Sequence, residues 1–248
     1  MSHARTIGRS LRLYHDATRR PALDAFHARF LGTCDLAFDV GCHVGDRAAS
    51  FLRLGARVVA VEPQPRLARA LRLMFGRDRD FTLIQALIGA SAGEAVLRLN
   101  SANPTVATAS TDFIAAAQGA PGWEGQVWDA EIPLPRTTLD ALIARHGAPD
   151  FMKIDVEGWE AEVLAGLSTA PRALSFEFTT IQREVGFAAL ARLTALGLRH
   201  FNACLGESME WAFPAAVDAA AMADWLRDLP AEANSGDIYG SGEAARLG

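Results

Sequence analysis

Lysine is almost absent from this chain of 248 residues, in which Lys153 stands alone beside 23 arginines. Cysteine is scarce as well, and its three residues form no CxxC pair, which argues against a disulfide framework and a structural zinc knuckle. No apolar run approaches the roughly 18 residues that a membrane span requires. The sequence therefore predicts no transmembrane segment.

The distribution of charge narrows the choice of partners. The net charge is −5, which argues against nucleic acid as a partner. The N-terminal stretch lacks the apolar core of a secretory signal, so we expect a cytoplasmic protein. Residues 1–80 nevertheless carry a net charge of +6. Arg5, Arg9 and Arg12 have helical spacing there, and they either steer an anionic substrate or form a solvated helix face.

Short apolar runs alternate with segments of helical periodicity, which predicts an α/β fold with a mostly parallel sheet covered on both faces. The expected strands cover residues 36–40, 57–61, 81–87, 95–99, 150–155, 173–178, 198–203 and 208–213. The expected helices cover residues 45–54, 65–75, 138–146, 158–167, 184–196 and 218–228. Residues 100–136 contain several proline breakers and are expected to be an irregular excursion over the sheet. We expect an N-terminal helical extension over residues 1–35 and one domain over residues 36–248.

Two strand ends carry residues suited to a nucleoside. In open α/β sheets, ligands bind outside the carboxyl ends of the strands. The first strand runs into a loop in which Asp39 precedes Gly41, His43 and Gly45, and these glycines allow a ligand to approach the backbone. The GxxxG spacing differs from the GxGxxG of dinucleotide-binding proteins. Glu62 ends the second strand and can accept hydrogen bonds from both hydroxyls of a ribose.

A third strand end carries an unusual set of charges. Strand alternation places Lys153 and Asp155 on one face, and Glu157 follows in the turn. A lysine inside a covered strand requires an acid or a ligand as its partner. Either a structural ion pair or a role in the active site explains the pair. The next strand contributes Glu177 at the same edge.

The combined motifs resemble the FkbM family of S-adenosylmethionine-dependent methyltransferases. The resemblance rests on FDVGCHVGD, on VEP after the second strand, on TTLDAL at 137–142, on KIDVEGWEAEVLAGL at 153–167, on SFEF and on the late SGDIYG. It implies a Rossmann-like class I methyltransferase fold, whose seven-stranded sheet ends in an antiparallel strand. It also implies O-methylation of a sugar, a glycan or a secondary metabolite. Cys42 and His43 replace the Ala-Asn that is usual in the family, and Trp159 replaces a residue that is often small.

The resemblance implies separate roles for the candidate residues. Loop amides from Gly41 to Gly45 would hold the carboxylate of S-adenosylmethionine, and Asp39 or Asp155 its ammonium group. Glu62 would bind the ribose, and Gln85 would reach the adenine. The expected cofactor-binding residues are therefore Asp39, Gly41, His43, Gly45, Glu62, Gln85 and Asp155.

An alcohol is a poor nucleophile at neutral pH, so its methylation benefits from a general base. Asp155, Glu157, Glu177 and His43 are candidates, and we favour Asp155 or Glu157, with Lys153 positioning the substrate oxygen or the acid. The expected catalytic residues are therefore Lys153, Asp155 and Glu157. Asp155, Glu157 and Glu177 could also hold Mg²⁺. No spacing requires a metal, and we expect none.

Two other functions remain open at this stage. A nucleotide-dependent oxidoreductase or epimerase is disfavoured, because GxGxxG is missing and neither tyrosine has a lysine four residues later. A non-catalytic nucleoside-binding module is the other alternative. The expected partner is a small-molecule or glycan acceptor.

Overall fold

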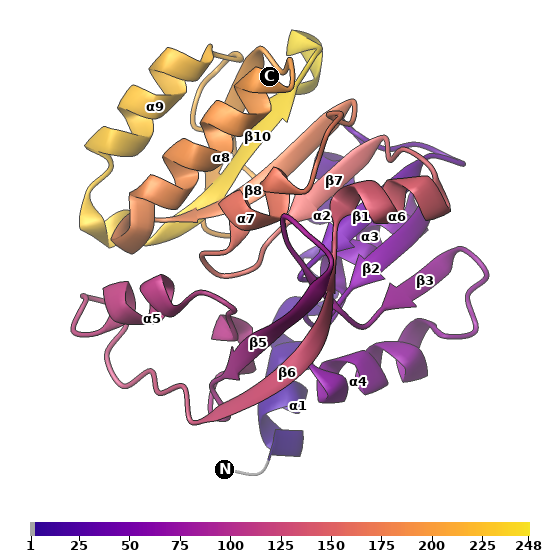
Figure 1. The fold of residues 1–248 in the computed structure, drawn as a ribbon. Helices are drawn as coiled ribbons and strands as arrows, with labels where there is room; N and C mark the ends of the chain where they lie inside the picture. Colours follow the sequence, from indigo (N-terminus) through magenta and orange to yellow (C-terminus); the bar gives the residue numbers. More distant parts are fainter. Residues whose placement is uncertain (1–2) are drawn as a thin grey trace.

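The computed structural model describes residues 3–248, with the side chains of residues 3–5, Arg5 among them, outside the described part. A seven-stranded sheet crosses the molecule, with helices on both of its faces (Figure 1). Its strands are β1 (Leu36–Val40), β2 (Arg57–Val61), β3 (Phe81–Ile84), β7 (Phe151–Ile154), β8 (Ala173–Thr179), β9 (His200–Leu205) and β10 (Ser235–Ser241). Their order is β3-β2-β1-β7-β8-β10-β9, and β10 runs antiparallel to both of its neighbours. The predicted sheet is confirmed.

Each helix predicted after residue 35 is present, with ends that differ by at most two residues. Those of the N-terminal extension are α1 (His3–Tyr14) and α2 (Arg20–His27). The others are α3 (Asp46–Arg53), α4 (Pro65–Phe75), α5 (Thr111–Ala117), α6 (Leu139–His146), α7 (Glu160–Ala165), α8 (Arg183–Ala195) and α9 (Ala219–Asp228). Ser110, Thr138 and Asp218 cap α5, α6 and α9 with side-chain oxygens that accept a backbone N–H bond. These caps give the three helices defined starts.

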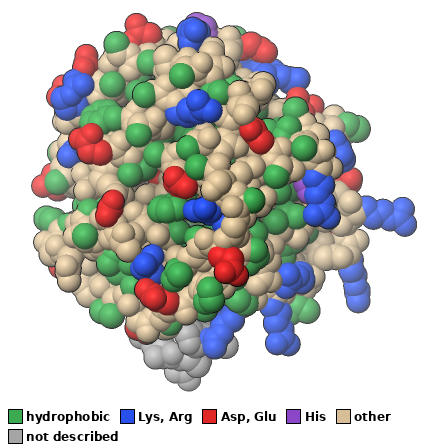
Figure 2. Space-filling model, viewed as in Figure 1, with side chains coloured by type: hydrophobic (Ala, Val, Ile, Leu, Met, Phe, Trp, Pro, Cys, Tyr) green, Lys and Arg blue, Asp and Glu red, His purple; other side chains and the backbone are tan. Residues whose placement is uncertain are grey.

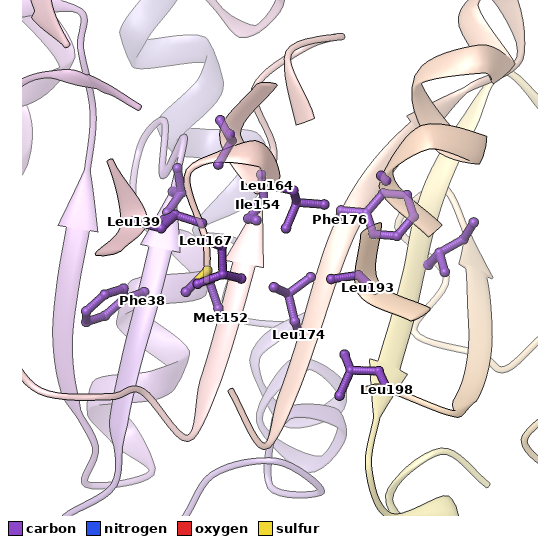
Figure 3. Close-up of a cluster of buried hydrophobic side chains, with 14 of the residues drawn as sticks. Phe38, Leu139, Met152, Ile154, Leu164, Leu167, Leu174, Phe176, Leu193 and Leu198 are labelled. Carbon is purple, nitrogen blue, oxygen red and sulfur yellow. The ribbon is translucent and has the colours of Figure 1, made fainter. Parts of the chain in front are cut away.

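Successive residues of β7 point to opposite faces of the sheet. Met152 and Ile154 point into the larger core, where side chains from β1, β8, α6, α7 and α8 surround them (Figure 3). Phe151 belongs to the core on the opposite face. Lys153 therefore lies on that opposite face, beside Asp39, with which it is in register across β1 and β7.

The prediction of a strand at residues 208–213 is wrong. Met209 has a φ of +55°, which lies outside the extended region. The last strand is instead β10, which inserts between β8 and β9. Its glycines are sites of close packing, because a Cβ at Gly236 would lie 2.3 Å from the carbonyl oxygen of Cys204. Glycine at this position allows two strands to pack closely, although in the sequence alone a glycine suggests a turn.

The prediction of an irregular excursion at residues 100–136 is also wrong in part. The region contains α5 and the start of β6 (Ala130–Thr137), which pairs with β5 (Gly93–Leu99) and with β4 (Leu87–Ile88) in a second sheet of three strands. The expected third strand at residues 81–87 accordingly stops at Ile84, and Leu87 begins the second sheet.

The N-terminal extension packs closely against the rest of the chain. Phe30 stacks on Phe151 of β7 and on Tyr239 of β10, with ring centroids 4.6 and 5.6 Å apart. His15 hydrogen-bonds through Nε2 to the carbonyl oxygen of Val44, at 2.8 Å. Among the described residues, no helix has the length and apolar character needed to cross a bilayer. The division at residue 35 stays a prediction.

We expect Gly41→Ala to destabilise the protein more than Gly119→Ala. Both glycines have a positive φ, +82° and +77°, but a Cβ at Gly41 would lie 1.7 Å from the carbonyl oxygen of Asp155, whereas one at Gly119 meets nothing within 4 Å. The conformational cost alone is about 1–2 kcal/mol, and overpacking raises the loss at Gly41 to about 3–5 kcal/mol. Chemical denaturation of both variants measures the difference, and equal losses would contradict the close approach.

Candidate active site

A cavity of about 290 Å³ lies at the carboxyl ends of β1, β2 and β7. Small-molecule pockets typically measure roughly 300–1,000 Å³, so this cavity is at the lower end of that range. Most of the residues predicted from the sequence line it together. They are Asp39, Gly41, His43, Glu62, Lys153, Asp155, Glu157 and Glu177.

Two predicted residues lie elsewhere. The side-chain oxygen of Gln85 accepts a hydrogen bond from Arg72 at 2.9 Å, and Gln85 does not line the cavity. The chain beyond Gln85 turns inward, so Ala86, Leu87 and Ile88 line this part of the wall. In this arrangement Gln85 does not face the cavity, and its contact with adenine stays a prediction. Gly45 also lies outside the lining, at the N-cap of α3.

The carboxylate of Glu62 is held in a fixed orientation at the end of β2. It accepts hydrogen bonds from the backbone N–H of His43 at 2.9 Å and from that of Gln64 at 2.8 Å. Only 2% of the residue is exposed. Burial raises the pKa of Glu62 to about 8, against the two hydrogen bonds, which lower it. Each oxygen retains a lone pair that a ligand hydroxyl can use.

The glycine loop brings two strand ends into contact. Gly41 lies so close to the carbonyl of Asp155 that no side chain fits between them. The loop amides are already bonded within the protein, since Gly41 and Cys42 donate to the carbonyl of Val61 and Gly45 donates to that of Cys42. The use of loop amides to hold a carboxylate of the cofactor stays a prediction. The close approach of Gly41 to Asp155 brings together the chain segments that follow β1 and β7.

Asp39 and His43 each leave a polar atom without a hydrogen-bond partner among the described residues, namely Oδ2 of Asp39 and Nε2 of His43. Burial, with the nearby charge of Asp46, raises the pKa of Asp39 to about 7. Burial lowers the pKa of His43, whose ring meets that of Tyr14 edge-on at 5.5 Å. Both atoms are free to bond a ligand.

Lys153 is the buried cation of the site. Its ammonium nitrogen lies 2.6 Å from Oδ1 of Asp237 and 3.1 Å from Oδ2 of Asp155. Although burial alone lowers the pKa of Lys153, these acids raise it well above its ordinary value. The lysine is therefore charged, as a buried ion pair requires.

Asp237 is a residue of the site that the sequence reasoning missed. It lies on β10, in register with Glu177 of β8, and it lines the cavity. Asp237 is the one acid within SGDIYG, a segment for which the sequence predicted no strand. Because the last strand was predicted at residues 208–213 instead, the second partner of Lys153 could not be identified.

Three carboxyl groups form an acidic wall beside Lys153. Ligand atoms of Asp155, Glu157 and Glu177 all lie within 4.8 Å of one another. Burial and the neighbouring acids raise the pKa of Glu157 and of Glu177 well above its ordinary value. Burial also tends to raise the pKa of Asp155, but the positive charge of Lys153 and its hydrogen bond outweigh burial, and the pKa of Asp155 is lowered. Asp155 is therefore the most acidic member of the three.

The N-terminal extension contributes to the mouth of the cavity. Tyr14 of α1 lines it, as do Arg47 and Glu207. Glu207 accepts hydrogen bonds from Arg47 at 2.6 Å and from Arg19 at 2.7 Å. This pair of contacts connects the segment after α1, helix α3 and the loop after β9.

The topology and the position of the cavity define a class I methyltransferase. The chain matches the methyltransferase FkbM domain over residues 39–229. It therefore belongs to the FkbM family, and it is an S-adenosylmethionine-dependent methyltransferase. This membership decides against the oxidoreductase and epimerase alternatives. Among curated proteins no significant match is found.

Solved structures resemble the chain at low sequence identity. A precorrin-6y C5,15-methyltransferase from Geobacter metallireducens is 12% identical, with a TM-score of 0.44 over 89% of this chain and 87% of that one. A TehB-like SAM-dependent methyltransferase from Corynebacterium glutamicum is 8% identical, with a TM-score of 0.45 over 90% and 88%. Aeropyrum pernix fibrillarin, solved with bound S-adenosyl-L-methionine, is 13% identical, with a TM-score of 0.40 over 88% and 76%.

We expect the stability of the cofactor-free protein to fall between pH 6.5 and pH 8. Glu62 ionises at about 8 in the folded protein against 4.5 for the ordinary group, so the folded state keeps a proton that the unfolded state has lost. The free energy of unfolding then decreases as the pH rises, by up to about 1.4 kcal/mol per unit for one such group. The buried histidines, whose pKa values are lowered from 6.5, oppose this trend most strongly below pH 6.5, and their effect fades as the pH rises above it.

Chemical denaturation at both pH values measures this slope. Glu62→Gln, which imitates the protonated acid, is expected to reduce the slope, and the other buried acids with raised pKa values supply the remainder. Glu94→Gln on the surface should leave the slope unchanged. A slope unaffected by Glu62→Gln would show that Glu62 is already ionised in the folded protein.

Proposed function

We propose that the protein methylates a hydroxyl oxygen of an uncharged sugar, glycan or secondary metabolite. The observation that carries this proposal is the acidic wall of Asp155, Glu157 and Glu177 beside Lys153, in the same cavity as Glu62. An ionised carboxylate can only accept hydrogen bonds, so it pairs with acceptor hydroxyl groups. The same oxygen atoms offer no hydrogen-bond donor to phosphate and carboxylate groups. A polyhydroxylated, uncharged acceptor fits both conditions.

The cavity also has groups that fit S-adenosylmethionine. Glu62 is oriented to accept hydrogen bonds from the ribose hydroxyls, because its backbone donors leave lone pairs free. The unpartnered oxygen of Asp39 suits the ammonium group of the cofactor. Gly41 supports both roles by holding the two strand ends together. His43 closes this side of the cavity, next to Tyr14.

We assign the role of general base to Asp155. The bound cofactor supplies a methyl group activated by a positively charged sulfur. Asp155 accepts the proton of the acceptor hydroxyl as the new C–O bond forms, and Lys153 keeps Asp155 ionised before that step. Asp237 fixes Lys153 from the other side. The raised pKa values of Glu157 and Glu177 favour their protonated forms, which can donate hydrogen bonds to Asp155.

The acidic wall does not require a metal ion for charge balance. Lys153 already supplies a positive charge 3.1 Å from Asp155. The raised pKa values of Glu157 and Glu177 favour their uncharged forms, which reduces the remaining negative charge. We therefore propose that turnover continues in the presence of a chelator. Loss of activity with EDTA that Mg²⁺ restores would contradict this proposal.

We expect Glu62→Ala to weaken binding of S-adenosylmethionine about 5- to 150-fold, which corresponds to about 1–3 kcal/mol for the lost hydrogen bonds and the ribose hydroxyls left without a partner. Isothermal titration calorimetry with S-adenosylmethionine and S-adenosylhomocysteine measures the effect. Glu94→Ala, at an exposed acid remote from the cavity, is the matched control. Unchanged affinity in Glu62→Ala would remove Glu62 from the cofactor site.

We expect Asp155→Asn to lower kcat about 10²- to 10⁴-fold, with little change in cofactor affinity, because general-base catalysis is lost while the bond from Lys153 to Asp237 remains. Release of S-adenosylhomocysteine, measured over uncharged glycosides and their phosphorylated counterparts, gives the rates. Turnover of the phosphorylated set alone would contradict the proposed acceptor class. Cofactor binding without turnover of any acceptor would favour the non-catalytic module.

A further inference from the structure

Helices α1 and α4 share a composition that the active site does not explain. Neither helix contains an acidic residue. Each has an exposed leucine one turn from an exposed arginine, with Leu13 following Arg9 in α1 and Leu73 following Arg69 in α4. Residues four apart on a helix lie on the same side, so each leucine and its arginine form one surface.

The two helices lie side by side. Near their starts, Thr6 and Ile7 of α1 line a second cavity together with Pro65 and Leu67 of α4. Near their ends, the ring centroids of His15 and Phe75 are 6.3 Å apart. In Figure 2, Lys and Arg side chains project from the lower right of the molecule, where Figure 1 places α4 beside α1. The exposed arginines of the two helices therefore lie on the same part of the protein surface.

We name this region the arginine–leucine face. It is defined by exposed residues of α1 and α4 and of the turn after α4, which are Arg9, Arg12, Leu13, Arg66, Arg69, Leu73, Met74, Arg77 and Arg79. Asp78 and Asp80, in that turn, are the acids that border it most closely in the chain. The face is thus strongly basic on a protein whose net charge is −5.

The exposure of its apolar side chains sets this face apart from an ordinary solvated helix surface. Leu73 is 81% exposed, Leu13 57% and Met74 41%. Only two other large hydrophobic residues of the described chain are comparably exposed, Val127 and Leu205. Three of the five thus lie among the arginines, so apolar and cationic groups are presented together.

We propose that the arginine–leucine face docks the protein on the surface of a membrane that contains anionic phospholipids. The arginines would pair with lipid phosphates, and Leu73, Met74 and Leu13 would enter the boundary between headgroups and acyl chains. The remainder of the chain, residues 81–248, carries a net charge of −11 and is repelled by the same surface. This asymmetry gives the docked protein one orientation.

Lipid fits the face better than nucleic acid does. A nucleic acid would use the arginines, but it offers the exposed leucines no apolar environment. Proteins that bind single strands also present aromatic side chains on which bases stack. The face has none among its exposed residues. Substitution of the leucines therefore distinguishes lipid binding from nucleic-acid binding in an experiment.

Docking would also place the active site near the lipid surface. Tyr14, which ends α1, lines the catalytic cavity, and Arg9 and Arg12 lie within two turns of it. Two turns of helix span roughly 11 Å. The docking proposal is independent of the acceptor, because none of its defining residues lines the catalytic cavity.

Co-sedimentation of the full chain with vesicles tests the proposal. We expect binding to vesicles of phosphatidylcholine mixed with phosphatidylglycerol, little binding to phosphatidylcholine alone, and weaker binding as salt is added. Arg69→Gln should lower the partition coefficient about fivefold, as the loss of one juxtamembrane charge does. Arg145→Gln on α6, also exposed, is the matched control and should have no effect.

Leu73→Ser is the decisive variant, because it keeps the charge and removes an exposed side chain whose loss leaves folding intact. We expect it to lower vesicle binding severalfold, whereas Val127→Ser should not. Thermal unfolding and cofactor affinity of Leu73→Ser should match those of the wild type. Equal binding to both vesicle types, or binding insensitive to these substitutions, would overturn the proposal. So would binding to an oligonucleotide that needs the arginines while vesicle binding is absent.

Discussion

The buried ammonium group of Lys153 is the charge on which the arrangement of the active site depends. It lies between Asp237 and Asp155, at 2.6 and 3.1 Å, and so connects the antiparallel strand β10 to the carboxyl end of β7. Removing any one of these charges leaves another without its partner in a buried environment. The chain uses arginine at every other basic position. A compact ammonium fits between two carboxylates where a planar guanidinium needs a wider set of acceptors.

The sequence predicts the part of the site that is made from local patterns. Gly41, Glu62 and Asp155 each follow a buried strand, and parallel strands bring their carboxyl ends to one edge, so their meeting in one cavity could be foreseen. The role of Asp237 could not, because it depends on β10 inserting between two strands that precede it in the chain. Gly236 and Gly240 resemble turn residues until the neighbouring strands are in place.

Two further contacts could not be foreseen from the sequence for the same reason. Gln85 stands at the end of an expected strand, but its amide is bound by Arg72 of α4, and the chain leaves for the second sheet two residues later. The amides of the glycine loop look free in the sequence, yet Val61 and Cys42 accept their hydrogen bonds. Propensity and spacing do not reveal such contacts, which form only when separate segments pack together.

Charge is divided between two regions of the protein. The cavity is lined by Asp155, Glu157 and Glu177, with Lys153 bonded to Asp155. The arginines of α1 and α4 face solvent without acids in either helix. In the functions proposed above, the first region would bind an uncharged, hydroxyl-bearing acceptor, and the second would bind an anionic surface outside the cavity. Tyr14 connects the two, as the end of α1 and as part of the cavity wall.

The central claim is that Gly41, Glu62 and Asp155 surround one cofactor. A crystal structure of the protein with S-adenosylhomocysteine tests it most directly. The account predicts ribose hydroxyls within hydrogen-bond distance of Glu62 and a sulfur atom directed toward Asp155 and Lys153. A nucleoside bound away from Glu62, for example in the cavity between α1 and the second sheet, would contradict it.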